Sequence, residues 1–564
     1  MVRQVAGRSC HLAGRRGEDH PITPYDTTSV GWMLDRILAR TNWDRIAEWP
    51  PDVFACTAVL LHVTGAFRFV VSPPAGEQWP PSCDWTMRVD EAATEWVARL
   101  NVGDTRLPQL VGESWQLLSL SRGTQLEDLA TGTSWEICQA ILTLHAVVDE
   151  AMADLDEAQG YPADTFEATA WRLLAETGSL SRLPTSGIRV LPKGRLAQGG
   201  INLRSLSRNL SSHVSPVDVS WTRVRLGDVE ERKRRGMTWN LLLIPWPFEI
   251  ADSDFQPTAG PLLNMDPESF GFFQFHPQRP LDLSHVQDAL EAAAAGDVAV
   301  HAVVLPEAAV VPEEIGLLEN LVAEHGAVFL ATGVREPCVS PTQLGRNYAH
   351  IGVWNGEEWT RLQADKHHRW NLDASQVHSY DLSSVLTPSK IWWEAISIPR
   401  RNIPIIDVGA GATAAVLICE DLARLDEVAE VLRYVGPSLV VALLLDGPQL
   451  ASRWSSRYAG VLADDPGSAV LTLTPLGMVS RFRCAGTATS RCIALWKDPE
   501  RGLREIEVDE AAGAVLLTLG ERRKTVWTAD GRCHPARTPW LVLEDVRQIQ
   551  LADRRRSDLA DTRA

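Results

Sequence analysis

The chain has 564 residues, of which 45% are hydrophobic and 22% are charged, and its formal net charge is −18 at pH 7. This composition is typical of a globular protein, and the length exceeds one ordinary core, so we expect two domains. The acidic charge argues against nucleic acid and anionic membrane as the main partners and favours a small-molecule substrate.

The sequence contains no run of eighteen or more apolar residues, because polar residues interrupt or end the longest candidates, 53–71 and 439–445. We therefore expect no transmembrane segment. The first twenty residues are rich in arginine and lack the apolar run of a secretory signal. The nine cysteines include no C-x-x-C pair and are odd in number, which is typical of reduced thiols. A cytoplasmic location is expected.

The N-terminal part of the chain has a helical pattern. Residues 1–25 show no apolar period and are expected to be a disordered lead-in. Over 26–175, apolar residues recur at intervals of three and four, which predicts a mainly α-helical N-terminal domain. Its many tryptophans are interpreted as core, with a surface for a protein partner as the alternative. The expected helices are 29–39, 53–64, 89–100, 134–155 and 166–175.

A change of pattern follows. Residues 176–236 are rich in Ser, Arg, Pro and Gly and are interpreted as a linker or irregular segment. Over 237–545, short apolar strands alternate with helices, which predicts a layered α/β domain, and 546–564 is expected to be a charged C-terminal tail. The expected strands are 240–245, 300–305, 327–332, 348–354, 413–419, 439–445 and 469–474, and the expected helices are 283–295, 312–325, 422–435 and 449–462.

Cys419 lies where a short apolar strand passes into a helix. Such a junction exposes a side chain near the free N–H groups of the helix start, and the dipole there favours a thiolate. The alternative is a small apolar strand residue, with Glu420 and Asp421 capping the helix.

Two further residues occupy comparable positions. Glu307 follows a buried strand and Pro306, where partial desolvation should raise its pKa toward that of a general base. A simple turn or helix start is the alternative there. Lys366, one of only six lysines among 54 basic residues, follows a strand-like segment and offers a compact charge for an oxyanion. A solvated lysine on a hairpin is the alternative.

Glu394, beside two tryptophans, lies between the lysine and the cysteine and could position either the lysine or an amide substrate. An interface position is the alternative. His367 and His368 do not predict a metal site, because neighbouring residues of a strand point to opposite faces and no partner cluster accompanies them.

The order Glu307, Lys366, Glu394 and Cys419 resembles the nitrilase or carbon-nitrogen hydrolase superfamily, over residues 238–545. The resemblance implies a four-layer α-β-β-α sandwich, usually a homodimer or higher homo-oligomer, and no cofactor. It implies that Cys419 attacks an amide or nitrile carbon to form a thioester and that Glu307 transfers protons. Lys366 and the backbone N–H of Glu420 would hold the oxyanion.

The residues around Cys419 refine this interpretation. The Cys-Glu-Asp sequence is more similar to the glutaminase part of glutamine-dependent NAD synthetases than to true nitrilases, so an amide substrate is favoured over a nitrile. No Ser-Gly-Gly loop follows, which excludes an NAD synthetase. The sequence departs from the family pattern in its long 366–419 segment, in Asp365 before the lysine, and in its helical N-terminal domain.

Two other functions remain open. The chain could be an interaction, sensor or assembly protein of a bacterial regulatory or defence system, with a protein partner on the N-terminal domain. It could also be a thioester-based amide or acyl transferase, because an amine or hydroxyl group can capture the same thioester.

Overall fold

The computed structural model describes residues 28–38, 43–153, 155, 165–194, 201–214, 217–223, 238–261, 265–409, 412–424, 428–483 and 490–550. The expected lead-in 1–25 lies outside the described residues, as do the end of the linker and the tail beyond 550. The chain divides into two compact units. Unit 1 comprises Met1–Lys193, Gly199–Ser215 and Trp527–Cys533, and unit 2 comprises Gly194–Gln198, Pro216–Val526 and His534–Ala564.

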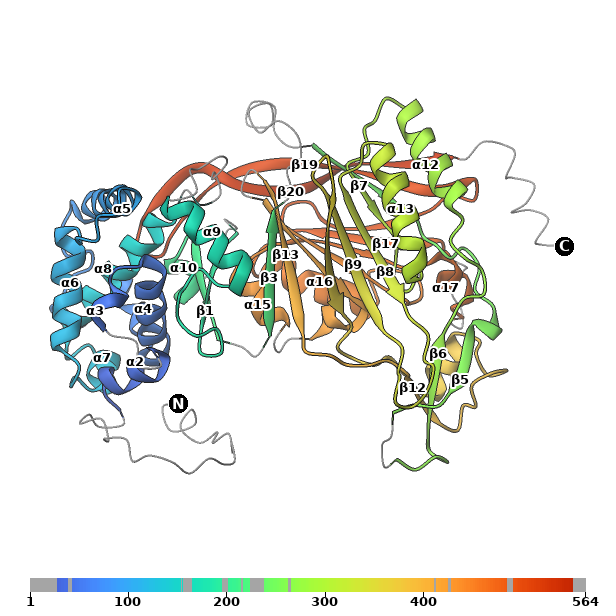
Figure 1. Ribbon diagram of the computed structural model, residues 1–564, viewed down its shortest axis with the longest axis horizontal. Coiled ribbons are helices and arrows are strands. Elements are labelled where there is room, and N and C mark those ends of the chain that lie inside the picture. Colours follow the sequence, from blue (N-terminus) through green and yellow to red (C-terminus); the bar gives the residue numbers. More distant parts are fainter. Residues whose placement is uncertain are drawn as a thin grey trace. The chain divides into compact units, whose positions relative to one another are not determined.

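Unit 1 is built around two buried helices, α4 (Pro50–Thr64) and α8 (Trp135–Ala151), which pack against each other. Helix α4 begins with two prolines, whose missing N–H groups are tolerated at a helix start, and ends at Gly65 with φ of 68°. The remaining helices and strands of this unit are α2 (Val30–Leu38), α3 (Trp43–Ile46), η1 (Ala66–Val70), α5 (Trp85–Asn101), α6 (Gln109–Leu120), α7 (Leu126–Thr131), α9 (Phe166–Thr177), β1 (Arg189–Pro192), α10 (Leu203–Leu206) and β2 (Leu210–His213) (Figure 1).

The tryptophans of unit 1 are mostly core residues. Six of them are less than 9% exposed, which agrees with the core interpretation over the partner-surface alternative. The buried tryptophans are Trp43, Trp49, Trp85, Trp96, Trp115 and Trp135.

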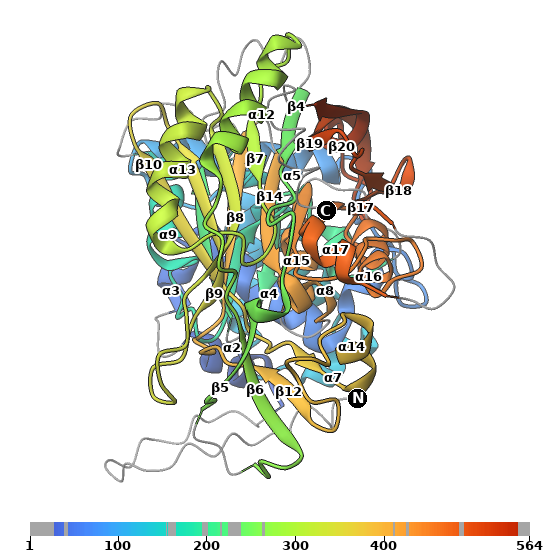
Figure 2. The same cartoon turned by 90° about the vertical axis from the view of Figure 1, so that its right-hand side faces the viewer.

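Unit 2 contains two large sheets. Within the described residues, the first has seven strands in the order β10-β9-β8-β7-β4-β19-β20, with β4, β7 and β8 parallel (Figure 2). The second also has seven, in the order β18-β17-β16-β15-β14-β13-β3, with β14, β15 and β16 parallel. The first sheet comprises β4 (Thr238–Leu243), β7 (Ala302–Val304), β8 (Phe329–Arg335), β9 (Asn347–Trp354), β10 (Trp359–Asp365), β19 (Ala512–Trp527) and β20 (Cys533–Gln550). The second comprises β3 (Asp218–Arg223), β13 (Asn402–Gly409), β14 (Ala412–Ile418), β15 (Leu439–Leu443), β16 (Ala469–Leu473), β17 (Cys492–Asp498) and β18 (Gly502–Glu507).

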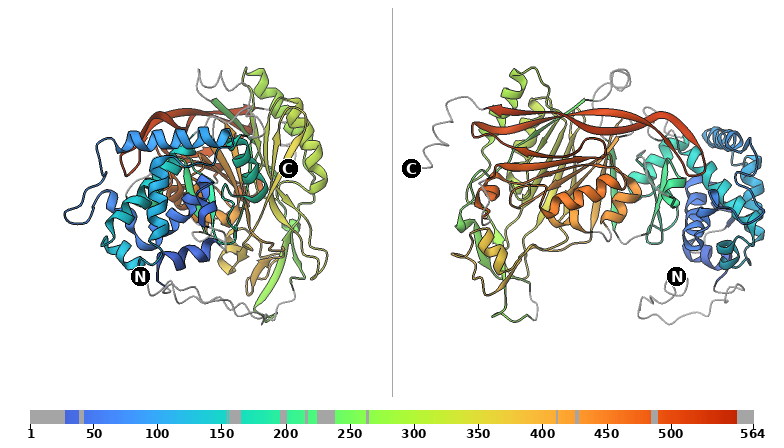
Figure 3. Two further views of the ribbon diagram at one scale, coloured as in Figure 1. Left: turned by 60° about the vertical axis from the view of Figure 1, so that its left-hand side comes forward. Right: turned by 180° about the vertical axis from the view of Figure 1, so that it is seen from behind.

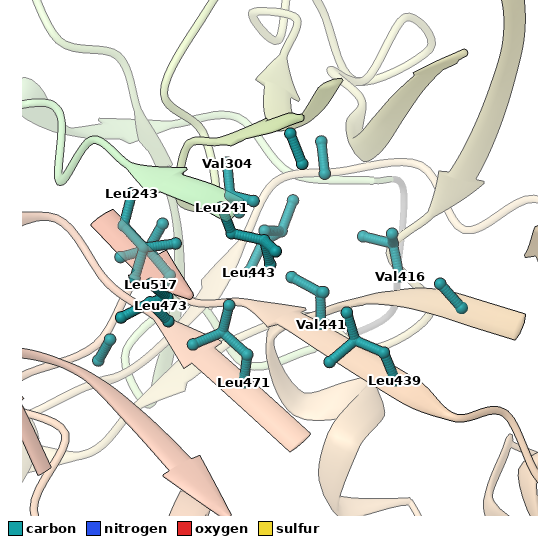
Figure 4. Close-up of a cluster of buried hydrophobic side chains, with 14 of the residues drawn as sticks. Leu241, Leu243, Val304, Val416, Leu439, Val441, Leu443, Leu471, Leu473 and Leu517 are labelled. Carbon is teal, nitrogen blue, oxygen red and sulfur yellow. The ribbon is translucent and has the colours of Figure 1, made fainter. Parts of the chain in front are cut away.

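The two sheets share one apolar core (Figure 4). Leu241 and Leu243 of β4 contribute to it from the first sheet, and Val441 and Leu443 of β15 contribute from the second. The alternate residues of β4 point to the other face of the first sheet, as the two-residue period of a strand requires. There Leu242 belongs to a second core that includes residues of α12 (Leu283–Ala295) and α13 (Pro312–Glu324).

On the second sheet, α16 (Trp454–Asp464) packs on β16 and β17 and also contacts α15 (Val428–Val435). The long hairpin of β19 and β20 is the red ribbon in Figure 3. A smaller sheet has the order β11-β12-β6-β5, and its core combines aromatic and aliphatic residues. The remaining elements are η3 (Asp252–Asp254), β5 (Phe255–Thr258), β6 (Phe270–Phe275), β11 (Asn371–Leu372), α14 (Ala374–Ser379), β12 (Ile391–Glu394), η4 (Cys419–Ala423) and α17 (Leu476–Arg481).

The mixed α/β class predicted from the sequence is confirmed, and several local expectations need correction. The segment expected to be a linker, 176–236, contains β1, α10, β2 and β3, of which β3 pairs in parallel with β13. The helix expected over 449–462 begins at Trp454, because the preceding residues follow β15 in a buried loop. In the described part of the chain, no helix combines the length and apolar character needed to cross a membrane.

Candidate active site

Glu307 is positioned by the first sheet. It follows β7 by three residues, its side chain is fully buried, and the next residue, Ala308, has a φ of 55°. The Glu307 backbone packs against β8 so closely that a Cβ atom at Gly333 would lie 2.3 Å from the Glu307 Cα atom. The N–H of Gly333 donates to the carbonyl of Pro306 at 3.0 Å, which fixes this loop to the sheet.

Cys419 is positioned by the second sheet. It is the first residue of η4, directly after β14, and is 3% exposed. Its φ is 48°, in the left-handed region that residues with a Cβ atom rarely adopt. Such a conformation costs about 1–3 kcal/mol and persists only where the surrounding structure imposes it, often at functional positions.

Lys366 joins two carboxylates. It follows β10, is 1% exposed, and its Nζ atom donates at 2.7 Å to Glu307 Oε1 and at 2.7 Å to Glu394 Oε2. Glu394 ends β12 of the smaller sheet, and its Oε2 atom also accepts from the N–H of Trp370 at 3.2 Å. Two carboxylates, one beside the first sheet and one from the smaller sheet, therefore meet at one buried ammonium group.

The structure thus brings together Glu307, Lys366, Glu394 and Cys419. Cys419 belongs to the same cluster, because the charges of Glu307 and Lys366 both act on the pKa of its thiol. Among the described residues, no group of three or more His, Cys, Asp or Glu side chains is arranged to hold a metal ion.

Burial and charge set the protonation of these groups. Desolvation by burial raises the pKa of Glu307, and the Lys366 charge acts in the opposite direction. Burial opposes the charged form of Lys366, but the negative groups around it outweigh this effect and raise its pKa well above the usual value. Lys366 is therefore an ammonium group at neutral pH.

The pKa of Cys419 corrects the expectation of a thiolate at rest. Burial raises this pKa well above its ordinary value of 9.0, the negative charge of Glu307 raises it further, and Lys366 offsets only part of the effect. The element that begins at Cys419 is a five-residue 3-10 helix, so it supplies little of the dipole that a long helix would provide. The resting sulfur is a thiol whose proton needs an acceptor.

The carboxylate of Asp421 connects the segment that begins at Cys419 to the segment that follows Lys366. His368 Nδ1 lies 3.2 Å from Asp421 Oδ1, and an Nη2 atom of Arg401 lies 3.7 Å from the same carboxylate. Asp421 follows Cys419 by two residues and His368 follows Lys366 by two. The carboxylate of Asp421 therefore holds together the two loops that carry the thiol and the ammonium group.

Glu420 follows Cys419 in the same short helix. Its N–H belongs to the first turn of η4, where amide groups have no acceptor within the helix. Its side chain turns to Arg424 and forms an ion pair of 2.9 Å.

Sequence reasoning missed Asn347, the first residue of β9. Its side-chain Nδ2 atom donates to Glu307 Oε1 at 2.8 Å and to Glu394 Oε1 at 2.7 Å. The expected strand began one residue later, at 348, so an asparagine entering an apolar strand was the only available signal.

No family model matches the chain, and no curated protein matches it. Among solved structures, it is similar to an amidase from Nesterenkonia sp. (17% identity, 50% of this chain and 90% of that chain, TM-score 0.29). It is similar to Nit3 of Saccharomyces cerevisiae, a member of branch 10 of the nitrilase superfamily (15% identity, 50% and 89%, TM-score 0.31). It is also similar to a carbon-nitrogen hydrolase from Helicobacter pylori G27 (11% identity, 55% and 94%, TM-score 0.25). The chain therefore resembles, at low identity, solved structures of the nitrilase superfamily.

Proposed function

We propose that this protein is a cysteine-dependent hydrolase of a non-peptide carbon-nitrogen bond, with an amide as substrate and a thioester as intermediate. The observation that carries the proposal is the buried ammonium group of Lys366, 2.7 Å from both Glu307 and Glu394. Burying three charges beside a strained cysteine costs stability even when the charges are paired, and such arrangements cluster at functional sites.

In the first half of the reaction, the Cys419 sulfur attacks the amide carbon and a carbon-sulfur bond forms. The thiol proton passes to Glu307, which is required because the resting sulfur is protonated. The electron pair of the carbonyl moves to its oxygen, and the Lys366 ammonium with the backbone N–H of Glu420 stabilises the resulting oxyanion. The carbon-nitrogen bond then breaks as Glu307 gives its proton to the leaving nitrogen, and ammonia or an amine departs.

In the second half, water hydrolyses the thioester. Glu307, again a carboxylate, takes a proton from the water as its oxygen attacks the thioester carbon. The carbon-sulfur bond breaks, the sulfur recovers a proton from Glu307, and a carboxylic acid is released. Two steps with a sulfur leaving group replace one attack of water on an unreactive amide.

The proposed architecture of unit 2 is a four-layer α-β-β-α sandwich. The core shared by the two sheets supports the inner layers, and the second core beneath α12 and α13 supports one outer layer. The packing of α16 on β16 and β17 supports the other. Unit 1 would then be a helical domain that regulates or restricts access to the substrate.

The proposal is tested by incubating the purified protein with a library of amides and nitriles while ammonia release and intact mass are measured. An acyl adduct on Cys419 that hydroxylamine removes, with ammonia release that is lost in Cys419→Ala, is the expected result. Cys83→Ser is the matched control, since Cys83 is exposed and far from the chemistry in sequence.

Other outcomes distinguish the alternatives. Ammonia release that persists in Cys419→Ala overturns the cysteine mechanism. An adduct that water leaves intact but an added amine or hydroxyl compound removes indicates a transferase. A Cys419 that neither acylates nor reacts with iodoacetamide refutes the enzyme and favours an assembly protein.

A further inference from the structure

Asn347 contacts each of the charged residues of the candidate site. Its Nδ2 atom donates to Glu307 Oε1 at 2.8 Å and to Glu394 Oε1 at 2.7 Å, and its backbone carbonyl accepts from the N–H of Lys366 at 2.8 Å. The residue is 4% exposed, so these contacts are shielded from water.

The four side chains form a closed set of hydrogen bonds. Asn347 and Lys366 both donate to the Oε1 atom of Glu307. On Glu394 they donate to different oxygens, Asn347 to Oε1 and Lys366 to Oε2. Glu307 Oε2 is buried and receives no hydrogen bond from an N–H or O–H group of the described residues. The oxygen of Glu307 that remains for the Cys419 thiol is therefore Oε2.

The chemistry of an amide side chain suits this position. An asparagine NH₂ group carries two donors and no charge, so it can bridge two carboxylates without competing with Lys366 for charge. The reverse orientation would direct Oδ1 at both carboxylates and is excluded by their repulsion. In this orientation Oδ1 is buried and accepts no hydrogen bond from the described residues.

We propose that Asn347 is a positioning residue, which locks Glu307 by its Oε1 atom so that Oε2 is held ready to accept the thiol proton. The inference rests on the proposed function, because it assigns Asn347 to the same base and nucleophile. It predicts a specific electrostatic effect: a neutral donor stabilises the charged carboxylate, so removal of Asn347 raises the pKa of Glu307.

The experiment measures the rate at which iodoacetamide alkylates Cys419 as a function of pH, by mass spectrometry on the full chain. This rate depends on Glu307 as proton acceptor and requires no knowledge of the substrate. In Asn347→Leu we expect a rate at pH 7 at least about tenfold lower, with the acid limb of the profile displaced to higher pH by about one unit. Where an active amide is known, kcat should fall by a similar factor while KM changes less than about threefold.

Asn240→Leu is the matched control. Asn240 is also a buried asparagine of the first sheet, 7% exposed, but its Nδ2 atom donates to the carbonyl of Ala299, away from the site. That variant should lose thermal stability without a shift of the alkylation profile. Asn347→Ser provides a second test if the leucine variant does not fold, because a hydroxyl group is polar but carries one donor and cannot bridge both carboxylates.

An unshifted alkylation profile in a folded Asn347 variant overturns the inference. The proposed function fails separately, if Cys419→Ala retains ammonia release or if no amide acylates Cys419. A shifted alkylation profile in a protein that hydrolyses no amide would retain the positioning role and reject the amidase. Amide hydrolysis together with an unshifted alkylation profile would support the amidase and reject the positioning role of Asn347.

Discussion

Replacing Gly333 by alanine tests the link between the first sheet and the candidate base. The new Cβ atom would lie 2.3 Å from Glu307 Cα, 2.4 Å from Ala308 N and 2.6 Å from the Pro306 carbonyl oxygen. All three are backbone atoms, so no side-chain rotation can relieve the overlap. Ordinary contact begins at 3.4 Å, so the segment that carries Glu307 must retreat by roughly 1 Å.

The displacement sets the expected magnitudes. Overpacking of this kind destabilises a core by about 1–3 kcal/mol, which lowers Tm by about 2–4 °C for each kcal/mol in a domain of this size. A misplacement of about 1 Å at a reacting group slows a reaction by about 100-fold. The Gly333→Ala variant should therefore fold, melt a few degrees lower, and lose most of its thiol reactivity.

Thermal melting and iodoacetamide alkylation of Cys419 at pH 7 measure the two effects. Gly316→Ala is the control, because Gly316 lies in α13 and a Cβ atom there meets nothing within 4 Å. That substitution should stabilise the protein by about 0.5–1 kcal/mol and leave alkylation unchanged. If Gly333→Ala labels and melts like the unaltered protein, the claim that the sheet fixes the position of Glu307 is refuted.

Three further predictions concern buried polar groups elsewhere in the chain. Arg532→Ala in the β19–β20 turn removes the cation that contacts Asp149 at 3.1 Å, and should destabilise the protein by about 3–5 kcal/mol in urea unfolding; a change below 1 kcal/mol would contradict the assignment of this pair. Burial lowers the pKa of His145 to about 3, against 6.5 in the unfolded chain, so the neutral buried histidine contributes fully to stability above pH 6.5 and less as the pH falls toward 3. The Tm of His145→Gln should therefore fall less steeply with pH over that range than the Tm of the unaltered protein. Parallel plots of Tm against pH would contradict the prediction. Tyr380→Phe removes the O–H that donates to the buried Asp446 and should lower the free energy of unfolding by about 1–3 kcal/mol, whereas an unchanged urea midpoint would show that the bond has no net value.

Much of the candidate site could be predicted because local sequence patterns report where buried strands end. Glu307 and Cys419 both follow short apolar runs, and the polar residue after such a run must lie at the edge of a sheet. The helix dipole was expected to favour a thiolate at Cys419, but the helix that begins there is short and burial raises the pKa of the thiol.

Several strands were not predicted from the sequence, for two different reasons. β5, β6 and β12 are short and rich in aromatic residues, and they belong to a small sheet whose burial depends on packing against distant segments. β19 and β20 carry many charged residues, so their alternation of apolar and polar residues was too weak to predict a pair of long strands. The pairing of β19 with β4 joins segments more than 250 residues apart.

The sequence by itself determined the change from helical to α/β patterning and the order of Glu307, Lys366, Glu394 and Cys419. Those features depend on local periodicity and residue type, which each segment carries whatever its surroundings. Only the tertiary structure decided that Lys366 lies 2.7 Å from both carboxylates and that Asn347 bridges them. These contacts join residues of the first sheet to Glu394 of the smaller sheet, and their distances depend on how the two sheets pack, which no local pattern encodes.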